Sequence, residues 1–404
     1  MVDPIPRTLR PSSHSNALRL FFANAFLSRK EIANIMNISP AAVTPIINDL
    51  YSKEIIKNAE NDGHTPNSVG RRQNLFSINA ESRYVLCVDI YPDYIYYGIT
   101  NLRGKTSYQE RQVNIIEKTS LEWVQKIAYH CLDIIKISAT PANKLLGIGI
   151  TIVGPVNHIE GIALHPFNMY DSPIPIREYF ERFVPFPVAV ESNVCASLRS
   201  ELLYRTSIGN SQNIIMLKWG PGIGSALAIN GVNYKGYNYQ SSEIGHNIFS
   251  SRTGKKCRCG RYGCLETLIS EDAVIEHISE LINTHSDIAS LAKKLGLPSK
   301  DNIKYFLQDP PAILQNYMVE CIKKLALTTN NAIILLSPEK VVLFGRFFIH
   351  DWIYSCFVKA IYDKNPLLNK NLFIRLLDVE NHSFMGATTI AIENSLLKDK
   401  ESGI

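Results

Sequence analysis

Residues 257–266 read CRCGRYGCLE, a stretch with three cysteines and two glycines around which the rest of the chain can be interpreted. Thiolates this close together, on a backbone that glycines allow to fold around a centre, suit a tetrahedral zinc ion. A fourth ligand is needed, and His246, eleven residues before Cys257, is the natural candidate. The alternative is three buried thiols that bind no metal. The spacing favours a structural zinc (Zn2+) site with no open position for catalysis, and its expected ligands are His246, Cys257, Cys259 and Cys264.

Apolar runs that precede this stretch predict the fold class. The chain has 404 residues, of which 46% are apolar and 20% charged, so it can bury a sizeable core over two or three domains. Helical spacing predicts a helix over residues 121–137. Short apolar runs predict strands over residues 85–90, 94–100, 145–153 and 187–191. Strands that alternate with helices in this way indicate an α/β fold.

The pattern C-x-C-G-x-x-G-C-x-E, with a histidine before it, resembles the zinc motif of the ROK family (repressors, open reading frames and kinases). This chain has one residue more than is usual between the histidine and the first cysteine. The resemblance implies a two-lobed, actin-like fold of the sugar-kinase type, with a ligand cleft between the lobes. In the family, the residues that match Glu243, His246 and Glu266 hydrogen-bond the sugar, a task that suits groups able to pair with hydroxyls. Residues 165–168 (HPFN) resemble the sugar-contacting loop, which implies a similar role for Asn168.

The segment that usually carries the catalytic Asp of the kinases differs in this chain. Residues 190–193 read VESN where the family usually ends in E-N-D, so Asn193 stands at the position of the catalytic Asp. A sugar kinase needs a carboxylate to accept the hydroxyl proton during phosphoryl transfer, and asparagine cannot take this proton. Asparagine can still hydrogen-bond a hydroxyl. We therefore expect Asn193 to contribute to sugar binding but not to catalysis.

The nucleotide side of the family pattern is also altered. The first phosphate loop, D-x-G-G-T in the kinases, reads DIYPD at residues 89–93, and the later glycine turn reads LFGRF at residues 343–347. Only GPGIG at residues 220–224 keeps the family pattern, and a glycine run alone is weak evidence. We therefore expect no useful ATP binding and no enzyme activity.

Two helix starts follow one another near the N-terminus. Ser28 and Glu31 form a capping box, and Ser39 is a second N-cap that is followed by Pro40. Two short helices joined by a tight turn at residues 36–38 form a helix-turn-helix. The second helix is expected to bury Val43, Ile46, Ile47 and Leu50. Its other face carries short side chains able to reach base edges in a major groove, and the alternative is a helical hairpin packed on its neighbour.

The residues after this pair of helices predict a wing. Residues 54–57 and 74–78 read as paired strands, and the polar loop between them ends in two arginines that can contact phosphates or the minor groove. The alternative is that these charges are solvated surface. The candidate DNA contacts are Arg29, Lys30, Ser39, Ala41, Thr44, Asn48, Arg71 and Arg72.

Residues 16–78 together resemble the winged helix of ROK repressors, with two departures. Pro45 lies one turn into the second helix, where it removes a helix hydrogen bond and favours a kink. Glu54 replaces a glycine that is usual at the helix end. The net charge of +5 is too small to indicate nucleic-acid binding alone, although residues 1–83 hold ten basic and seven acidic side chains. No stretch predicts a membrane span or a secretory signal, so we expect a cytoplasmic protein.

These observations lead to one functional hypothesis and two alternatives. The hypothesis is a DNA-binding regulator, a repressor of sugar uptake or catabolism genes, that responds to a sugar or sugar phosphate and acts on operator DNA as a dimer or tetramer. The alternatives are an active ROK sugar kinase with an appended DNA-binding domain, and a repressor controlled by a protein partner. The expected domains are residues 1–80, a first lobe at 81–196 completed by a helix near 385–397, and a second lobe at 197–384.

Overall fold

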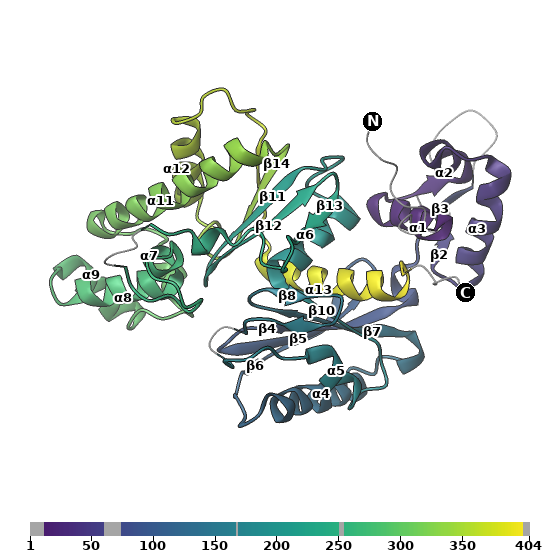
Figure 1. The fold of residues 1–404 in the computed structure, drawn as a ribbon, viewed down its shortest axis with the longest axis horizontal. Helices are drawn as coiled ribbons and strands as arrows, with labels where there is room; N and C mark the ends of the chain where they lie inside the picture. The colour runs from purple at the N-terminus through teal and green to yellow at the C-terminus, as the bar shows by residue number, and fades with distance from the viewer. Residues whose placement is uncertain (1–11, 60–73, 167–168, 250–253, 399–404) are drawn as a thin grey trace. The chain divides into compact units, whose positions relative to one another are not determined.

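The computed structural model describes residues 12–59, 74–166, 169–249 and 254–398 (Figure 1). The chain divides into two compact units, one made of Met1–Thr206 with Ser383–Ile404 and the other of Ser207–His382. The finer division into three domains that the sequence suggests stays a prediction. Among the described residues, none of the helices is long and apolar enough to cross a membrane.

The N-terminal segment contains three helices and a three-stranded sheet in the order β1-β3-β2. Its elements are α1 (Ser13–Ala23), β1 (Leu27–Ser28), α2 (Arg29–Met36), α3 (Pro40–Ser52), β2 (Ile56–Asn58) and β3 (Leu75–Ile78). Both predicted caps are confirmed. Ser28 Oγ accepts a bond from Glu31 N while Glu31 Oε2 accepts one from Ser28 N at 2.7 Å, and Ser39 Oγ accepts from Ala42 N. Asn37, in the left-handed conformation, makes the turn between α2 and α3.

The exit from α3 corrects one strand boundary. The first strand of the pair was expected to begin at Glu54, but β2 begins at Ile56. Glu54 has a φ of 59°, the left-handed conformation that favours glycine at a helix end. Because Glu54 still belongs to this exit turn, the strand starts two residues later. Helix α3 continues through Pro45 and buries Val43, Ile46, Ile47 and Leu50, as predicted.

Besides a two-stranded sheet of β8 (Val156–Asn157) and β9 (Ile162–Ala163), the rest of the described first unit has a five-stranded sheet with helices on both faces (Figure 1). The strands, in the order β10-β7-β4-β5-β6, are β4 (Tyr84–Ile90), β5 (Tyr94–Asn101), β6 (Thr106–Val113), β7 (Leu145–Ile152) and β10 (Val188–Ser192). Helices α4 (Ser120–Ile137) and α5 (Ile176–Glu181) cover one face, while α6 (Asn193–Tyr204) and α13 (Val379–Ser395) lie on the other. A Cβ on Gly149 would lie 2.0 Å from Ala387 O, so glycine is required where α13 crosses β7. All four strands and the helix predicted for this lobe are confirmed within one residue at each end.

The second unit repeats the sheet topology of the first. Its strands, in the order β13-β12-β11-β14-β15, are β11 (Ile214–Trp219), β12 (Ile223–Ile229), β13 (Val232–Tyr234), β14 (Lys340–Phe344) and β15 (Phe373–Arg375). In both sheets, three consecutive antiparallel strands are extended by two parallel ones beside the first strand. This duplication, of which the sequence shows no repeat, gives the two-lobed actin-like fold that was expected.

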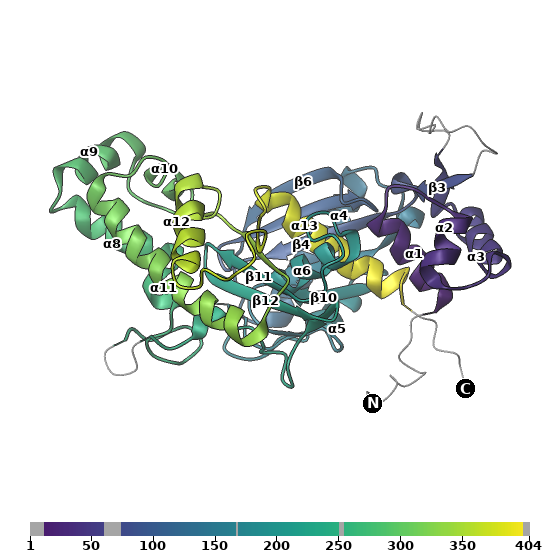
Figure 2. The ribbon, with the colours of Figure 1, turned by 90° about the horizontal axis from the view of Figure 1, so that it is seen from above.

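The helices of the second unit share its main core with the sheet. They are α7 (Glu266–Ile269), α8 (Glu271–Ile282), α9 (Ser286–Leu295), α10 (Ile303–Phe306), α11 (Ala312–Leu336) and α12 (Asp351–Tyr362). Helices α8, α9 and α10 lie farther from the sheet than α11 and α12 (Figure 2). The long helix α11 packs along α12 and places Leu314, Met318 and Leu325 in the core. This core supports the strand ends and the turn that carry the polar residues of the second unit.

Candidate metal centre and binding residues

Four side chains in the second unit are arranged to hold a metal ion. The ligand atoms of His246, Cys257, Cys259 and Cys264 all lie within 4.8 Å of one another. Cys259 Sγ and Cys264 Sγ are 3.6 Å apart, and Cys257 Sγ lies 3.5 Å from His246 Nδ1. Around a tetrahedral ion with metal–sulfur bonds of about 2.3 Å, neighbouring ligand atoms are roughly 3.5–3.8 Å apart. The four predicted residues therefore fit a tetrahedral metal ion.

Tight turns in the cysteine motif bring these ligands together. Gly260 and Gly263 have φ values of 86° and 69°, which other residues adopt only with strain. The backbone N–H of Cys257 donates to Arg261 O at 2.7 Å, so the first two cysteines lie on a small closed loop. Burial raises the pKa of the Cys257 thiol to about 12. Binding of a cation would therefore be coupled to release of the thiol proton.

His246 also faces a carboxylate with its second ring nitrogen. It ends a short 3-10 turn (Ile244–His246), and its Nε2 lies 3.7 Å from Glu243 Oε2. Burial and the nearby charge of Glu266 raise the pKa of Glu243 to about 7. Glu266, the first residue of α7, accepts the backbone N–H of Ile223 at 3.1 Å. The structure thus brings Glu243, His246 and Glu266 together beside the cysteines, as the motif implied.

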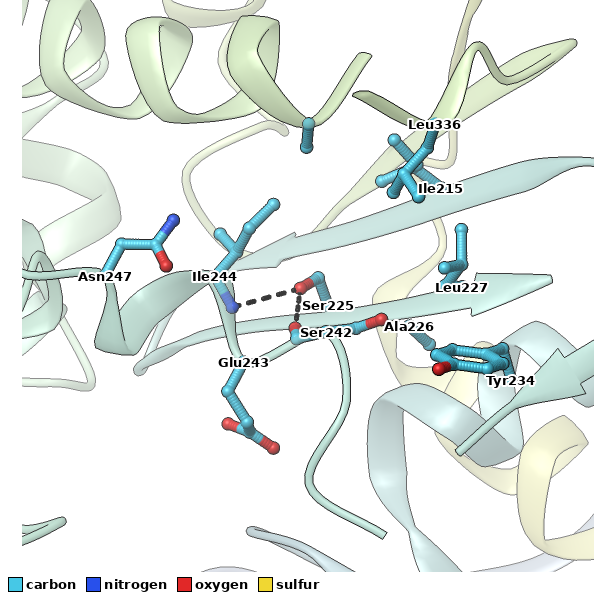
Figure 3. A pocket seen from close by; sticks show the side chains of 11 residues that line it. Ile215, Ser225, Ala226, Leu227, Tyr234, Ser242, Glu243, Ile244, Asn247 and Leu336 are labelled. Carbon is cyan, nitrogen blue, oxygen red and sulfur yellow. Dashed lines mark hydrogen bonds between the residues drawn. The ribbon is translucent and has the colours of Figure 1, made fainter. Parts of the chain in front are cut away.

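An apolar pocket lies beside the turn that carries Glu243. Its volume is about 270 Å³, and it is lined by Ile215, Ser225, Ala226, Leu227, Tyr234, Ser242, Glu243, Ile244, Asn247, Ala332 and Leu336. Figure 3 shows the Glu243 side chain pointing away from Ile244 and Leu336. Ser225 Oγ donates to Ser242 O and accepts from Ile244 N, which fixes the backbone on which Glu243 is mounted. The exposed wall of the pocket is mostly apolar, so it suits a sugar poorly.

The first unit contributes a row of buried polar groups at the ends of its parallel strands. Asp89, Thr151 and Glu191 are paired across β4, β7 and β10, and Thr151 Oγ1 donates to Asp89 Oδ1 at 2.6 Å. Asn193 follows this row as the first residue of α6 and is largely buried. Sequence reasoning identified Asn193 but missed Thr151. The available signal was a polar residue near the end of an otherwise apolar predicted strand.

The nucleotide-side segments differ from open glycine-rich loops. In the first unit, Tyr91 N donates to Tyr94 O at 2.9 Å, which closes the turn after β4. In the second unit, Arg346 Nη1 lies 3.3 Å from both carboxylate oxygens of Glu271. A Cβ on Gly220 would lie 3.2 Å from Arg346 Cβ, so this ion pair sits beside the turn at residues 220–224.

The candidate DNA contacts lie partly within the described residues. Lys30, Ser39, Ala41, Thr44 and Asn48 are exposed, and Arg29 is half-buried. The Arg29 guanidinium lies 4.8 Å from the centre of the Phe76 ring and donates to Asn48 Oδ1 at 3.3 Å, so α2, α3 and β3 meet at this point. Arg71, Arg72 and the sugar-loop candidate Asn168 lie outside the described residues.

The chain is similar to known proteins both in sequence and in fold. The model of the ROK family matches residues 85–393. A xylose repressor from Caldicellulosiruptor bescii is 22% identical over 341 residues, which cover 82% of this chain and 84% of the repressor. A crystal structure of a ROK family transcriptional regulator, a homolog of the E. coli MLC protein, aligns with a TM-score of 0.76 and 19% identity over 94% of this chain and 96% of its own. A ROK glucokinase from Streptomyces griseus, solved with glucose and AMPPNP, aligns with a TM-score of 0.66 and 18% identity over 77% of this chain and 99% of its own.

Proposed function

The chain belongs to the ROK family, and from this membership we propose that it is a sugar-responsive, DNA-binding transcriptional repressor without kinase activity. The observation that carries the proposal is the solvent-exposed face of α3, which presents Ala41, Thr44 and Asn48 on a helix joined to a ROK fold. Short side chains of this kind reach base edges in the major groove. The resemblance to a named xylose repressor over 82% of the chain supports the same role.

In this proposal α2, α3 and the β2–β3 pair form a winged helix-turn-helix. Lys30 and Arg29 at the start of α2, and Ser39 at the start of α3, contact the DNA backbone together with Arg71 and Arg72 of the wing. Such contacts fix the orientation of the protein on the duplex, while α3 reads the sequence. The protein acts as a dimer or tetramer, which presents two such helices to an operator with two half-sites. We propose that it does so in the cytoplasm.

The effector is a sugar or sugar phosphate held by hydrogen bonds. Asn193 and Asn168 supply amide groups, and Glu243, His246 and Glu266 supply carboxylates and an imidazole. A bound Zn2+ would be structural, because His246, Cys257, Cys259 and Cys264 fill a tetrahedral shell. His246 Nδ1 faces the metal site, which leaves Nε2 for the effector, and Glu266 is held two residues after the last cysteine ligand.

Three features support the absence of kinase activity. Asn193 has no carboxylate to accept a hydroxyl proton. The turn after β4 carries tyrosine and proline in place of glycines, so the backbone offers no open phosphate loop. Arg346 is engaged by Glu271 beside the remaining glycine turn. Calorimetric titration with ATP and magnesium should therefore detect no binding in the micromolar range, and micromolar binding would support the kinase alternative.

A thermal-shift screen against free and phosphorylated sugars tests the effector assignment. D-xylose and D-glucose are the first sugars to include, because a relative is named a xylose repressor and a ROK neighbour was solved with glucose. A sugar present at about 100 times its dissociation constant stabilises the folded protein by about 2.7 kcal/mol. A clear hit supports the proposal. No hit across a broad panel favours control by a protein partner instead.

A further inference from the structure

A chain of charged side chains runs from the Asn193 end of α6 to the first helix of the DNA-binding segment. Glu191 Oε1 accepts the backbone N–H of Ser192 at 2.8 Å, and Glu191 Oε2 accepts from Arg199 Nη1 at 3.1 Å. Arg199 Nε also donates to Glu393 Oε2 at 2.6 Å. The second oxygen of Glu393 accepts from Arg19 Nη1 at 3.2 Å. Four side chains from β10, α6, α13 and α1 thus form one continuous network, which we call the α6 relay (Arg19, Glu191, Arg199, Glu393).

The α6 relay is shielded from solvent at one end and open at the other. The Glu191 side chain is 0% exposed, Arg199 is 21% exposed and Arg19 is 40% exposed. Burial opposes the charge of Arg199, but the carboxylates of Glu393 and Glu191 outweigh it and raise its pKa, so the guanidinium stays charged. Breaking one of these buried contacts would leave a charge without its partner, which is costly. A displacement of Glu191 should therefore be passed to Arg199 and Glu393.

The helices that carry the relay pack closely against one another. A Cβ on Gly386 of α13 would lie 2.9 Å from the Ala196 carbonyl carbon of α6, so the two helices meet backbone to backbone. At the far end of α6, the Tyr204 ring contacts Phe22 of α1 edge-to-face with centroids 5.6 Å apart. Helix α6 has 12 residues and spans about 17 Å. It joins Asn193, a residue of the proposed effector site, to the core beneath the DNA-binding helices.

We propose that Arg199 and Glu393 are positioning residues that transmit effector binding at Asn193 through α6 and α13 to α1, and so change the affinity for operator DNA. This inference rests on the proposed function, because it assigns the route by which a sugar controls DNA binding. The coupling acts on α1, which supports the helix-turn-helix, rather than on a DNA-contacting side chain. A contact that only stabilises the fold would change the melting temperature but leave the effector-dependent change in DNA affinity intact.

The test uses full-length protein and compares operator affinity with and without sugar. An operator duplex is first selected from a random library by the wild-type protein. Its dissociation constant is then measured by fluorescence anisotropy, with and without saturating D-xylose or D-glucose, whichever binds in calorimetry. The ratio of the two constants is the coupling factor. By linkage, the sugar affinity of the DNA-bound protein must change by the same factor, which checks each value independently.

Four variants separate coupling from stability. Arg199→Met removes the guanidinium that faces both Glu191 and Glu393, and we expect it to destabilise the fold. The informative changes are therefore Arg19→Gln at the exposed end and Glu393→Gln at the centre. Both should bind sugar within about twofold of wild type in the absence of DNA but lower the coupling factor roughly threefold or more. Arg19→Lys keeps the charge and should retain the coupling. Arg182→Gln, which removes an exposed arginine paired with Glu178 on α5, is the matched control and should also retain it.

Two results would overturn the inference. If the wild-type protein is coupled and Arg19→Gln and Glu393→Gln are coupled to the same extent, the relay is structural only and the proposed function stands. If sugar leaves the operator affinity of the wild-type protein unchanged, the proposed function itself fails, and this inference fails with it.

Discussion

The His/Cys cluster of the second unit (His246, Cys257, Cys259, Cys264) and the interface of α1 in the first unit both depend on buried polar contacts, but they join residues over very different distances along the chain. All four cluster residues lie between His246 and Cys264. The α1 interface, formed by Ser15, Arg19, Phe22, Arg103, Tyr204, Glu393 and Leu397, joins residues as far apart as 382 positions in the chain. A local motif can be read from spacing, whereas a contact between the two ends of the chain exists only once the fold is formed.

The two regions also differ in what they hold. The cluster fixes Glu243, His246 and Glu266 on one turn and one short helix. The α1 interface holds the whole N-terminal segment, because α1 shares a single hydrophobic core with the end of α6 and with α13. Arg103 strengthens this attachment, because its guanidinium donates to Phe21 O, Phe22 O and Asn24 O at 2.8–3.1 Å. A cation at the C-terminal end of a helix is favourable for the free carbonyls there.

The largest expected effect is on the His/Cys cluster of the second unit. Cys259→Ser removes one metal ligand, so we expect the bound zinc to fall from one equivalent to near zero. Structural zinc sites supply much of the folding free energy of the segments they hold. The free energy of unfolding of the second unit should therefore fall by about 3 kcal/mol or more, which lowers its melting temperature by roughly 6–12 °C. Metal analysis and differential scanning calorimetry measure both quantities. Cys356→Ser, at a half-buried cysteine of α12 outside the cluster, is the control and should change neither. Retention of metal and melting temperature in Cys259→Ser would refute the zinc assignment.

The second prediction concerns Arg103 in the α1 interface. Arg103→Met keeps most of the side-chain volume but leaves three carbonyls at the end of α1 without their donor, which should cost about 2 kcal/mol in the free energy of unfolding. Urea unfolding followed by circular dichroism measures this loss. Arg182→Met removes an exposed ion pair on α5 and should cost less than about 0.5 kcal/mol. Equal effects of the two variants would show that α1 is not held by Arg103.

The smallest expected effect comes from removing a single hydroxyl of the α1 interface, that of Tyr204. Tyr204 is buried, and its hydroxyl donates to Leu102 O at 2.8 Å. Tyr204→Phe should therefore cost about 1 kcal/mol in the same urea experiment, because the carbonyl loses its partner. Tyr129→Phe, at a half-exposed tyrosine of α4, should be close to neutral. If Tyr204→Phe were also neutral, the packing of the Tyr204 ring on Phe22 would account for this part of the interface without the hydrogen bond.

The sequence was sufficient for features determined by near neighbours. The capping box at Ser28, the N-cap at Ser39, the buried face of α3 and the strands of the first lobe all follow from residues a few positions apart, and the structure confirms them. The grouping of Glu243, His246 and Glu266 could be anticipated because the resemblance to the ROK family implies that these residues lie together. The left-handed conformation of Glu54 was missed because strand propensity predicts extended backbone there, while the helix end requires a turn.

Other features could not be predicted because their partners are distant in the chain. Arg199 and Glu393 look like ordinary surface charges until α13 packs on α6 and pairs them. Arg103 does so until the fold brings the last carbonyls of α1 beside it. Thr151 is a single polar residue in an apolar run, and its role depends on the register that pairs it with Asp89. The repeated sheet topology is invisible in the sequence because each sheet needs only apolar strands in the right order, not similar residues.

The most direct test of the proposed repressor function is to titrate sugar into the complex of wild-type protein with its selected operator and to follow release of the DNA by fluorescence anisotropy. We predict that a sugar which binds the free protein in calorimetry weakens operator binding about 5-fold or more, the lower range of allosteric coupling between two sites. A complex that keeps its operator affinity at a sugar concentration shown to saturate the protein would contradict the proposed function.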